Sequence, residues 1–157
     1  MPPSDPPINT SEGPRAFSCQ LRDTRALDPP VDGVELAALY RECFPEGTWT
    51  ADSALNALHR CQYIAVRRDA GKLIAVLGLE LMPIPSDPLY LVASPKWLAV
   101  AKSHRGHGLS KELGYEVVRV AHALGAKQFT GVTRDFTPPV EKFWRAMGVP
   151  KSAEYVF

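Results

Sequence analysis

Residues Lys96–Gly125, KWLAVAKSHRGHGLSKELGYEVVRVAHALG, decide the fold of this chain. Trp97–Val100 is a mostly apolar run of strand length and predicts a short strand. Gly106 and Gly108 follow, and because glycine has no Cβ, they let the backbone turn sharply and bring successive N–H groups near a ligand. The stretch therefore predicts a strand, a glycine turn and then a helix.

A long amphipathic helix is expected from Leu109 onward. Its apolar residues recur at the spacing of one helix face, and they are Leu109, Leu113, Val117, Val120, Ala121 and Leu124. Gly125 is a natural end for this helix. The turn before it, with Arg105 alongside, suits a phosphate group, because free N–H groups and the positive end of the helix dipole both lie there.

The turn Arg105-Gly106-His107-Gly108-Leu109-Ser110 resembles the pyrophosphate-binding signature of the GNAT superfamily of acetyl-CoA-dependent N-acetyltransferases. That signature is Gln or Arg, two free positions, Gly, one free position, then Gly or Ala. Arg105 and Gly108 match it, whereas Ser110 departs from it but is still small. Downstream, the block Phe143–Val149 resembles the later helix of the family and its end. Loop, helix and block stand in the family's order over most of the chain, which makes the resemblance specific.

The resemblance implies acetyl-CoA as co-substrate, with no metal. Its pyrophosphate would lie on the loop, and its pantetheine arm would enter a gap where the strand Leu98–Val100 parts from the next strand, Gln128–Thr133. One strand N–H would then stabilise the oxyanion of a tetrahedral intermediate. The residues expected to contact the cofactor are Leu98, Ala99, Val100, Arg105, Gly106, His107, Gly108, Leu109, Ser110, Thr137 and Phe143.

Catalysis needs a neutral amine and often a base that takes its proton. Glu80, near the end of an apolar strand, is the best candidate for the base. An equal alternative is that Glu80 is only a carboxylate at the rim of a strand end, with no catalytic role. Asp87 and Asp135 lie in proline-flanked loops and are weaker candidates.

Trp144 stands where many family members have a tyrosine that acts as general acid. The indole has only an N–H donor and does not titrate in the useful range. We interpret Trp144 as a core anchor on its helix or as a contact to the pantetheine arm. Tyr155, Tyr115 or water could supply the proton instead, or no acid is used.

The acceptor pocket of this fold is made by the first two helices. Tyr40 and Trp49 are therefore predicted to bind substrate, although aromatic residues at helical spacing usually belong to a core. The sequence does not choose among amine acceptors. Two alternatives to an active N-acyltransferase remain: a catalytically impaired acyl-CoA-binding or sensing module of the same fold, and a protein-interaction domain with a proline-rich tail as its ligand segment.

Composition agrees with one soluble domain. The 157 residues are 45% hydrophobic and carry a formal net charge of +1, so charge gives no reason to expect a nucleic-acid or membrane partner. The N-terminal stretch lacks the basic and apolar regions of a signal peptide. Cys19, Cys43 and Cys61 have no metal-ligand spacing, which favours a reduced, cytoplasmic protein. Expected partners are acetyl-CoA and an amine acceptor, with a homodimer as an alternative to a monomer.

The fold class predicted from the order of elements is α/β: a GNAT-like, mixed, mostly antiparallel central sheet flanked by helices, in one domain. Residues 1–14 are expected to be a disordered tail and residues 15–157 the acyltransferase domain. The expected strands are Ala16–Arg22, Cys61–Arg68, Leu73–Met82, Leu89–Ala93 with Lys96–Ala101, Gln128–Thr133 and Ala153–Phe157. The expected helices, besides the long one, are Val34–Phe44, one capped by Thr50 or Asp52 that ends near Arg60, and Pro139–Met147. Pro83–Pro88 is predicted to be a rigid connector, and Ser94-Pro95 a bulge or strand break.

Overall fold

The computed structural model describes residues 31–131 and 138–148 of the chain. The expected strands Ala16–Arg22 and Ala153–Phe157, and the tail 1–14, lie outside these residues. So do Asp135 and Thr137. No helix of the described part is long and apolar enough to cross a membrane.

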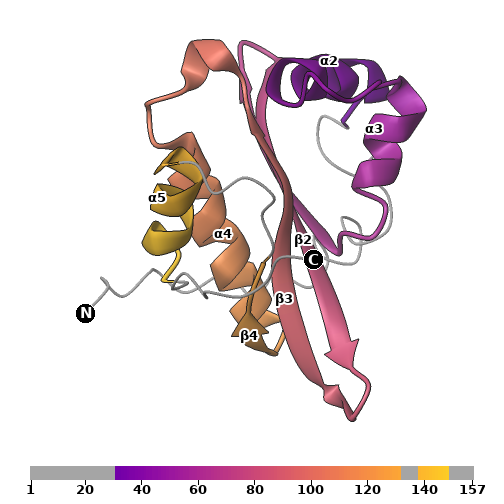
Figure 1. Ribbon diagram of the computed structural model, residues 1–157, viewed down its shortest axis with the longest axis vertical. Coiled ribbons are helices and arrows are strands. Elements are labelled where there is room, and N and C mark those ends of the chain that lie inside the picture. The colour runs from indigo at the N-terminus through magenta and orange to yellow at the C-terminus, as the bar shows by residue number, and fades with distance from the viewer. Residues whose placement is uncertain (1–30, 132–137, 149–157) are drawn as a thin grey trace.

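A four-stranded sheet in the order β1-β2-β3-β4 forms the middle layer of the described part (Figure 1). The first three strands, β1 (Tyr63–Asp69), β2 (Lys72–Ile84) and β3 (Asp87–Val100), are antiparallel neighbours. The fourth, β4 (Ala126–Phe129), runs parallel to β3. This is the mixed, mostly antiparallel sheet that the sequence predicts.

Helices cover both faces of the sheet (Figure 1). On one face lie α2 (Gly33–Cys43) and α3 (Ala51–Ala57), which begin at reciprocal side-chain caps on Asp32 and Thr50. On the other face lie α4 (Leu109–Ala123) and α5 (Pro138–Ala146). A single turn of 3-10 helix, Lys102–His104, leads from β3 towards α4.

The core is divided between the two faces of β2, as expected for a central strand. Ile74 and Val76 pack towards α2 and α3, and Ala75, Leu77 and Leu79 pack towards α4. Leu73 packs with the first group, although strict alternation along a strand would put it with the second. The register shift between Arg67 and Arg68 of β1, next to the start of β2, accompanies this change of face.

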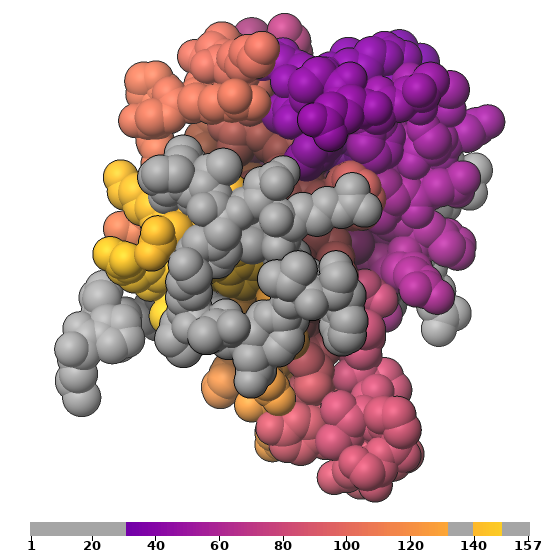
Figure 2. Space-filling model, viewed as in Figure 1, coloured from indigo at the N-terminus to yellow at the C-terminus, as the bar shows by residue number. Residues whose placement is uncertain are grey.

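The expectation of a rigid connector at Pro83–Pro88 is wrong. β2 and β3 continue through these residues as one long hairpin, in which Pro83 is opposite Leu91 and Ile84 is opposite Asp87. Figure 2 shows this hairpin standing out from the body of the molecule. The register shift between Pro83 and Ile84 takes up the irregularity that the prolines impose on the ladder.

Candidate functional site

Among the described residues, the edge of β3 that faces β4 is paired over only part of its length. β4 pairs with β3 at Leu91, Val92 and Ala93, and the N–H of Thr130 donates to the Ala93 carbonyl at 2.8 Å. Within residues 31–131 and 138–148, nothing pairs with this edge of β3 beyond Ala93. Leu98–Val100, the segment predicted to hold the pantetheine arm, thus has no strand partner on this edge among the described residues. Strand β4 itself begins and ends earlier than the predicted Gln128–Thr133.

A bulge lies in β3 beside this free edge. Between Val76 and Gly78 of β2, the partner residues on β3 move from Ala99 to Lys96, so β3 has one extra residue. Trp97, within the bulge, has a left-handed backbone with φ of 57°. The sequence predicts a bulge or break at Ser94-Pro95, but Pro95 keeps its register opposite Leu79 and the bulge lies two residues further on. A bulge leaves backbone groups out of the ladder, and these can serve a ligand.

The turn after β3 is open to solvent. Gly106 and Gly108 have φ of 82° and 80°, and a Cβ built on either would meet no atom within 4 Å. No described residue accepts a hydrogen bond from the N–H groups of residues 106–111, and Gly108 gives α4 no side-chain cap. His107 is exposed, whereas Leu109 and Ser110 are half-buried. The turn thus presents consecutive free amides at the positive end of α4.

Arg105 holds the turn against the end of β3. Its Nε donates to the Val100 carbonyl at 3.0 Å, and its Nη2 lies 3.4 Å from Cys43 Sγ on α2. The imidazole of His104 pairs with the Asp69 carboxylate at 2.8 Å, which fastens the preceding 3-10 turn to the β1–β2 hairpin. These contacts hold the turn from both sides.

The remaining strand residues predicted to contact the cofactor point to opposite faces. Leu98 and Val100 pack partly buried on the α4 side, next to Leu109, and Ala99 is buried on the α2 side. The backbone edge of this segment, rather than any one side chain, is therefore what it offers to a ligand.

On the face of the sheet that carries α4, α5 contributes two aromatic rings. Phe143 lies against Gly114 of α4 and meets Trp144 edge-on, with ring centroids 5.5 Å apart. The indole of Trp144 is 9% exposed and lies over Gly131, where a Cβ would come within 2.0 Å of it. Trp144 is thus a core anchor, one of its two predicted roles.

Glu80 lies on β2 opposite the buried Ser94, on the face that carries α2 and α3. Its side chain is 14% exposed, and Lys96 Nζ lies 3.8 Å from the carboxylate. Burial, together with the nearby charge of Glu80, raises the pKa of the Cys61 thiol to about 12. The weaker candidate Asp87 is instead at the tip of the β2–β3 hairpin, where it accepts a hydrogen bond from Leu89 N–H.

Four aromatic side chains form a cluster between α2, the α2–α3 loop and the bulge of β3; they are Tyr40, Phe44, Trp49 and Trp97. Tyr40 is fully buried, which raises its pKa, and its hydroxyl has no partner among the described residues. Trp49 is half-buried and donates to the Phe44 carbonyl at 3.1 Å. Trp97 is 39% exposed and forms the outer surface of the cluster.

Sequence reasoning did not foresee that Trp97 joins this aromatic cluster. The available signal was a bulky aromatic two residues after a proline within a strand, which is a place where bulges occur. Across residues 31–131 and 138–148, no three His, Cys, Asp or Glu side chains come together as metal ligands would.

The chain matches a protein-family model over most of its length. A sequence model described as the acetyltransferase (GNAT) family matches residues 33–149. No protein of curated function matches the sequence significantly.

Solved structures give the same fold at low sequence identity. A putative acetyltransferase from Agrobacterium tumefaciens has a TM-score of 0.64 at 18% identity, covering 78% of this chain and 90% of its own. A ribosomal-protein-alanine N-acetyltransferase from Brucella melitensis has a TM-score of 0.62 at 15% identity, covering 80% and 90%. The enzyme AAC(6')-Iy, solved in complex with a bisubstrate analogue of CoA, has a TM-score of 0.62 at 17% identity, covering 80% and 88%.

Proposed function

Because this chain belongs to the acetyltransferase (GNAT) family, we propose that it moves an acetyl group from acetyl-CoA to an amine acceptor by direct attack through a tetrahedral intermediate. The observation that carries the proposal is the run of amides from residue 106 to residue 111, which have no acceptor among the described residues, beside an edge of β3 that is unpaired within residues 31–131 and 138–148. Free amides at a helix start bind phosphate, and a free strand edge pairs with amide groups.

The turn fits the pyrophosphate of coenzyme A. The space around Gly106 and Gly108 is open, so phosphate oxygens can approach the backbone closely. Arg105 adds a positive charge at the same turn while its Nε keeps the loop on the Val100 carbonyl. The free edge at Leu98–Val100 would hold the pantetheine arm, and the bound thioester supplies the activated acetyl group.

Glu80 is the proposed general base. It lies near the bulge on the face that carries α2 and α3, and Lys96 orients its carboxylate. From there it would take the proton of the acceptor amine directly or through one water molecule. Trp144 is buried and has no titratable group, so the thiolate of coenzyme A would leave unprotonated or take its proton from another donor.

The acceptor would lie against the aromatic cluster, where Trp49 and Trp97 have exposed surface. This wall extends the sequence prediction, which named Tyr40 and Trp49. Tyr40 would support the wall from beneath, because it is fully buried.

A second function is also compatible with Trp144, because a buried indole stands where many family members have a tyrosine as general acid. A GNAT fold that lacks the usual acid at this position could bind acyl-CoA and sense it without turnover. Both functions predict acetyl-CoA binding, and only the first predicts release of free thiol when amines are added.

Calorimetric titration with acetyl-CoA tests the proposal. The substitution Arg105→Ala should weaken binding by about 1–3 kcal/mol, because charge-assisted hydrogen bonds to phosphate are lost. Arg60→Ala, an exposed arginine in the turn after α3, is the matched control and should leave the affinity unchanged. A wild-type protein that binds no acetyl-CoA contradicts the proposal, and thiol release with a panel of amines separates the enzyme from the sensor.

A further inference from the structure

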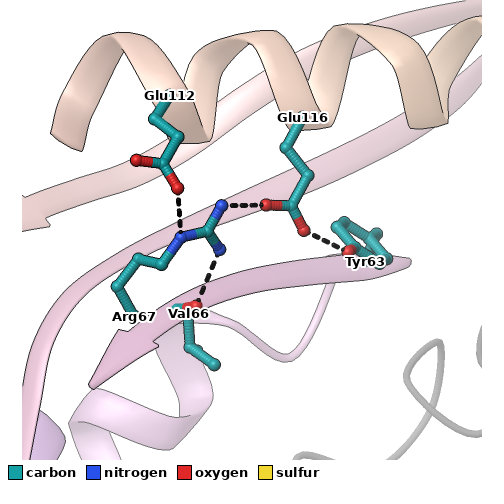
Figure 3. A network of polar contacts seen from close by, with 5 residues as sticks. All are labelled: Tyr63, Val66, Arg67, Glu112 and Glu116. Carbon is teal, nitrogen blue, oxygen red and sulfur yellow. Dashed lines mark hydrogen bonds and ion pairs between the residues drawn. The ribbon is translucent and has the colours of Figure 1, made fainter. Parts of the chain in front are cut away.

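Arg67 bridges β1 and α4 through two carboxylates (Figure 3). Its Nε donates to Glu112 and its Nη2 donates to Glu116, each at 2.7 Å. Its third nitrogen, Nη1, donates to the Val66 carbonyl at 2.9 Å. Every nitrogen of the guanidinium therefore has a partner, and the side chain is held in one place between strand and helix.

Tyr63 completes the network by donating its hydroxyl to Glu116 at 2.5 Å. Burial and the Glu116 carboxylate raise the pKa of Tyr63, so this hydroxyl stays a donor. Glu116 is thus shared between two donors from β1, whereas Glu112 depends on Arg67 and is 55% exposed.

Glu112 lies in the first turn of α4, where its own N–H donates to the Gly108 carbonyl. Glu112 directly follows residue 111, the last of the amides at which we place the coenzyme's pyrophosphate. A negative charge in the first helical turn would repel a phosphate bound at the turn, and salt screens that repulsion with a Debye length of about 8 Å at physiological ionic strength. The structure places a guanidinium directly on that carboxylate.

We propose that Arg67 is a positioning residue for the coenzyme site: by neutralising Glu112 it keeps the start of α4 favourable for phosphate anions. The inference rests on the proposed function, since it needs coenzyme A to bind at this turn. It goes beyond that function because Arg67 lies on β1 and belongs to none of the elements that form the turn.

A merely structural role for the network gives different expectations. If Arg67 only fastened α4 to the sheet, loss of either partner would disturb the turn, and Glu112→Gln would weaken coenzyme binding as Arg67→Met does. If Arg67 instead neutralises the charge of Glu112, Arg67→Met should weaken acetyl-CoA binding, whereas Glu112→Gln should leave it unchanged or strengthen it. Lys111 and Arg119 on the same helix stay in place in every variant and do not affect this comparison.

Acetyl-CoA titration of the full chain at low and high ionic strength separates these alternatives. Arg67→Met should weaken binding about three- to tenfold at low ionic strength and less at high ionic strength. Glu112→Gln alone should bind at least as tightly as wild type. The double variant Arg67→Met/Glu112→Gln should return to within about twofold of wild type, because the uncompensated carboxylate is gone.

Arg68→Met is the matched control. Arg68, the next residue on β1, pairs with Glu35 of α2 on the opposite face of the sheet at 2.7 Å. This variant should lose thermal stability and keep wild-type affinity for acetyl-CoA.

Three results overturn the inference: wild-type affinity in Arg67→Met, weaker binding in Glu112→Gln, or a double variant as weak as Arg67→Met. Should Arg67→Met not fold, Glu112→Gln still decides the sign of the effect. A wild-type protein that binds no acetyl-CoA refutes the proposed function itself and is therefore a separate outcome.

Discussion

The surroundings of Glu80 restrict the motion of its side chain, which suits a general base. Its side chain is mostly buried, faces Ser94 across the ladder and is approached by the ammonium group of Lys96. A carboxylate held in this way can accept a proton in a reproducible geometry. Because Lys96 is paired with Glu80, removing Lys96 tests how the carboxylate is oriented, whereas replacing Glu80 tests proton transfer.

Glu80→Gln should lower kcat by about 10²- to 10⁴-fold, because the amide cannot accept the amine's proton. The affinity for acetyl-CoA should not change, since Glu80 is remote from the turn at the start of α4. Lys96→Met is the control: it removes the orienting partner and should cost less than Glu80→Gln. Steady-state kinetics over a range of pH provide the measurement, and an unaltered pH–rate profile in Glu80→Gln would reject Glu80 as the base.

Single residues also show what sequence reasoning cannot reach. The roles of Trp97 and Arg67 depend on which residue lies opposite which. The proline two residues before Trp97 is a local sign of a bulge, but no local pattern gives the position of the bulge or the partner of Arg67. Trp97 is turned towards Tyr40 by a bulge whose position depends on the pairing of β2 with β3. Arg67 meets Glu112 across 45 residues of sequence. By contrast, the open glycine turn could be predicted, because its chemistry is local.

At the scale of elements, the helices were the most predictable. The buried residues Leu113, Val117, Val120 and Ala121 of α4 lie at the spacing read from the sequence, and Gly125 has the positive φ of a helix terminator. The β2–β3 hairpin was predicted less well. Its prolines predict a break, but the pairing of the flanking strands outweighs that local preference.

The pair between Glu35 and Arg68 joins α2 to β1 and gives a prediction about acid stability. The hydrogen bonds from Arg68 lower the pKa of Glu35 below its ordinary value of 4.5, and they outweigh the opposite effect of partial burial. A carboxyl with a lowered folded-state pKa stabilises the fold fully above its unfolded value. That contribution is lost as the pH falls through the folded value.

Glu35→Gln should therefore lower the free energy of unfolding by about 0.5–1 kcal/mol at neutral pH. The difference from wild type should disappear at a pH below the folded-state pKa of Glu35. Glutamine can keep the bond to the Asp32 N–H, so the helix cap is preserved. Urea unfolding at several pH values measures the effect. Glu141→Gln, which removes an exposed pair with Arg145 on α5, should change stability less, and an effect independent of pH would count against the ion pair.

On the scale of the whole molecule, two separate core layers share one sheet. Leu113 lies in the layer under α4, and Cys61 lies in the layer under α2 and α3. Cys61 is buried and burial raises its thiol pKa to about 12, so it reacts only when the protein opens. The rate at which Cys61 reacts therefore measures how often the layer under α2 and α3 opens.

Leu113→Ala should destabilise the protein by about 2–5 kcal/mol, because a fully buried side chain is truncated. If the layers unfold together, modification of Cys61 should become at least about thirtyfold faster. Mass spectrometry of the peptide that carries Cys61 gives the rate. His122→Ala, at an exposed position of the same helix, should leave it unchanged. A lower melting temperature without faster modification would mean that the layers open independently.

The left-handed backbone of Trp97 has a practical consequence. It fixes a half-exposed indole, packed edge-on against Trp49, beside the stretch of β3 that a coenzyme would occupy. Indole emission is sensitive to the polarity around the ring, so the fluorescence of Trp97 should change when a coenzyme binds beside β3. With Trp49 and Trp144 replaced by phenylalanine, a fluorimeter would be enough to screen acyl donors without attaching a dye.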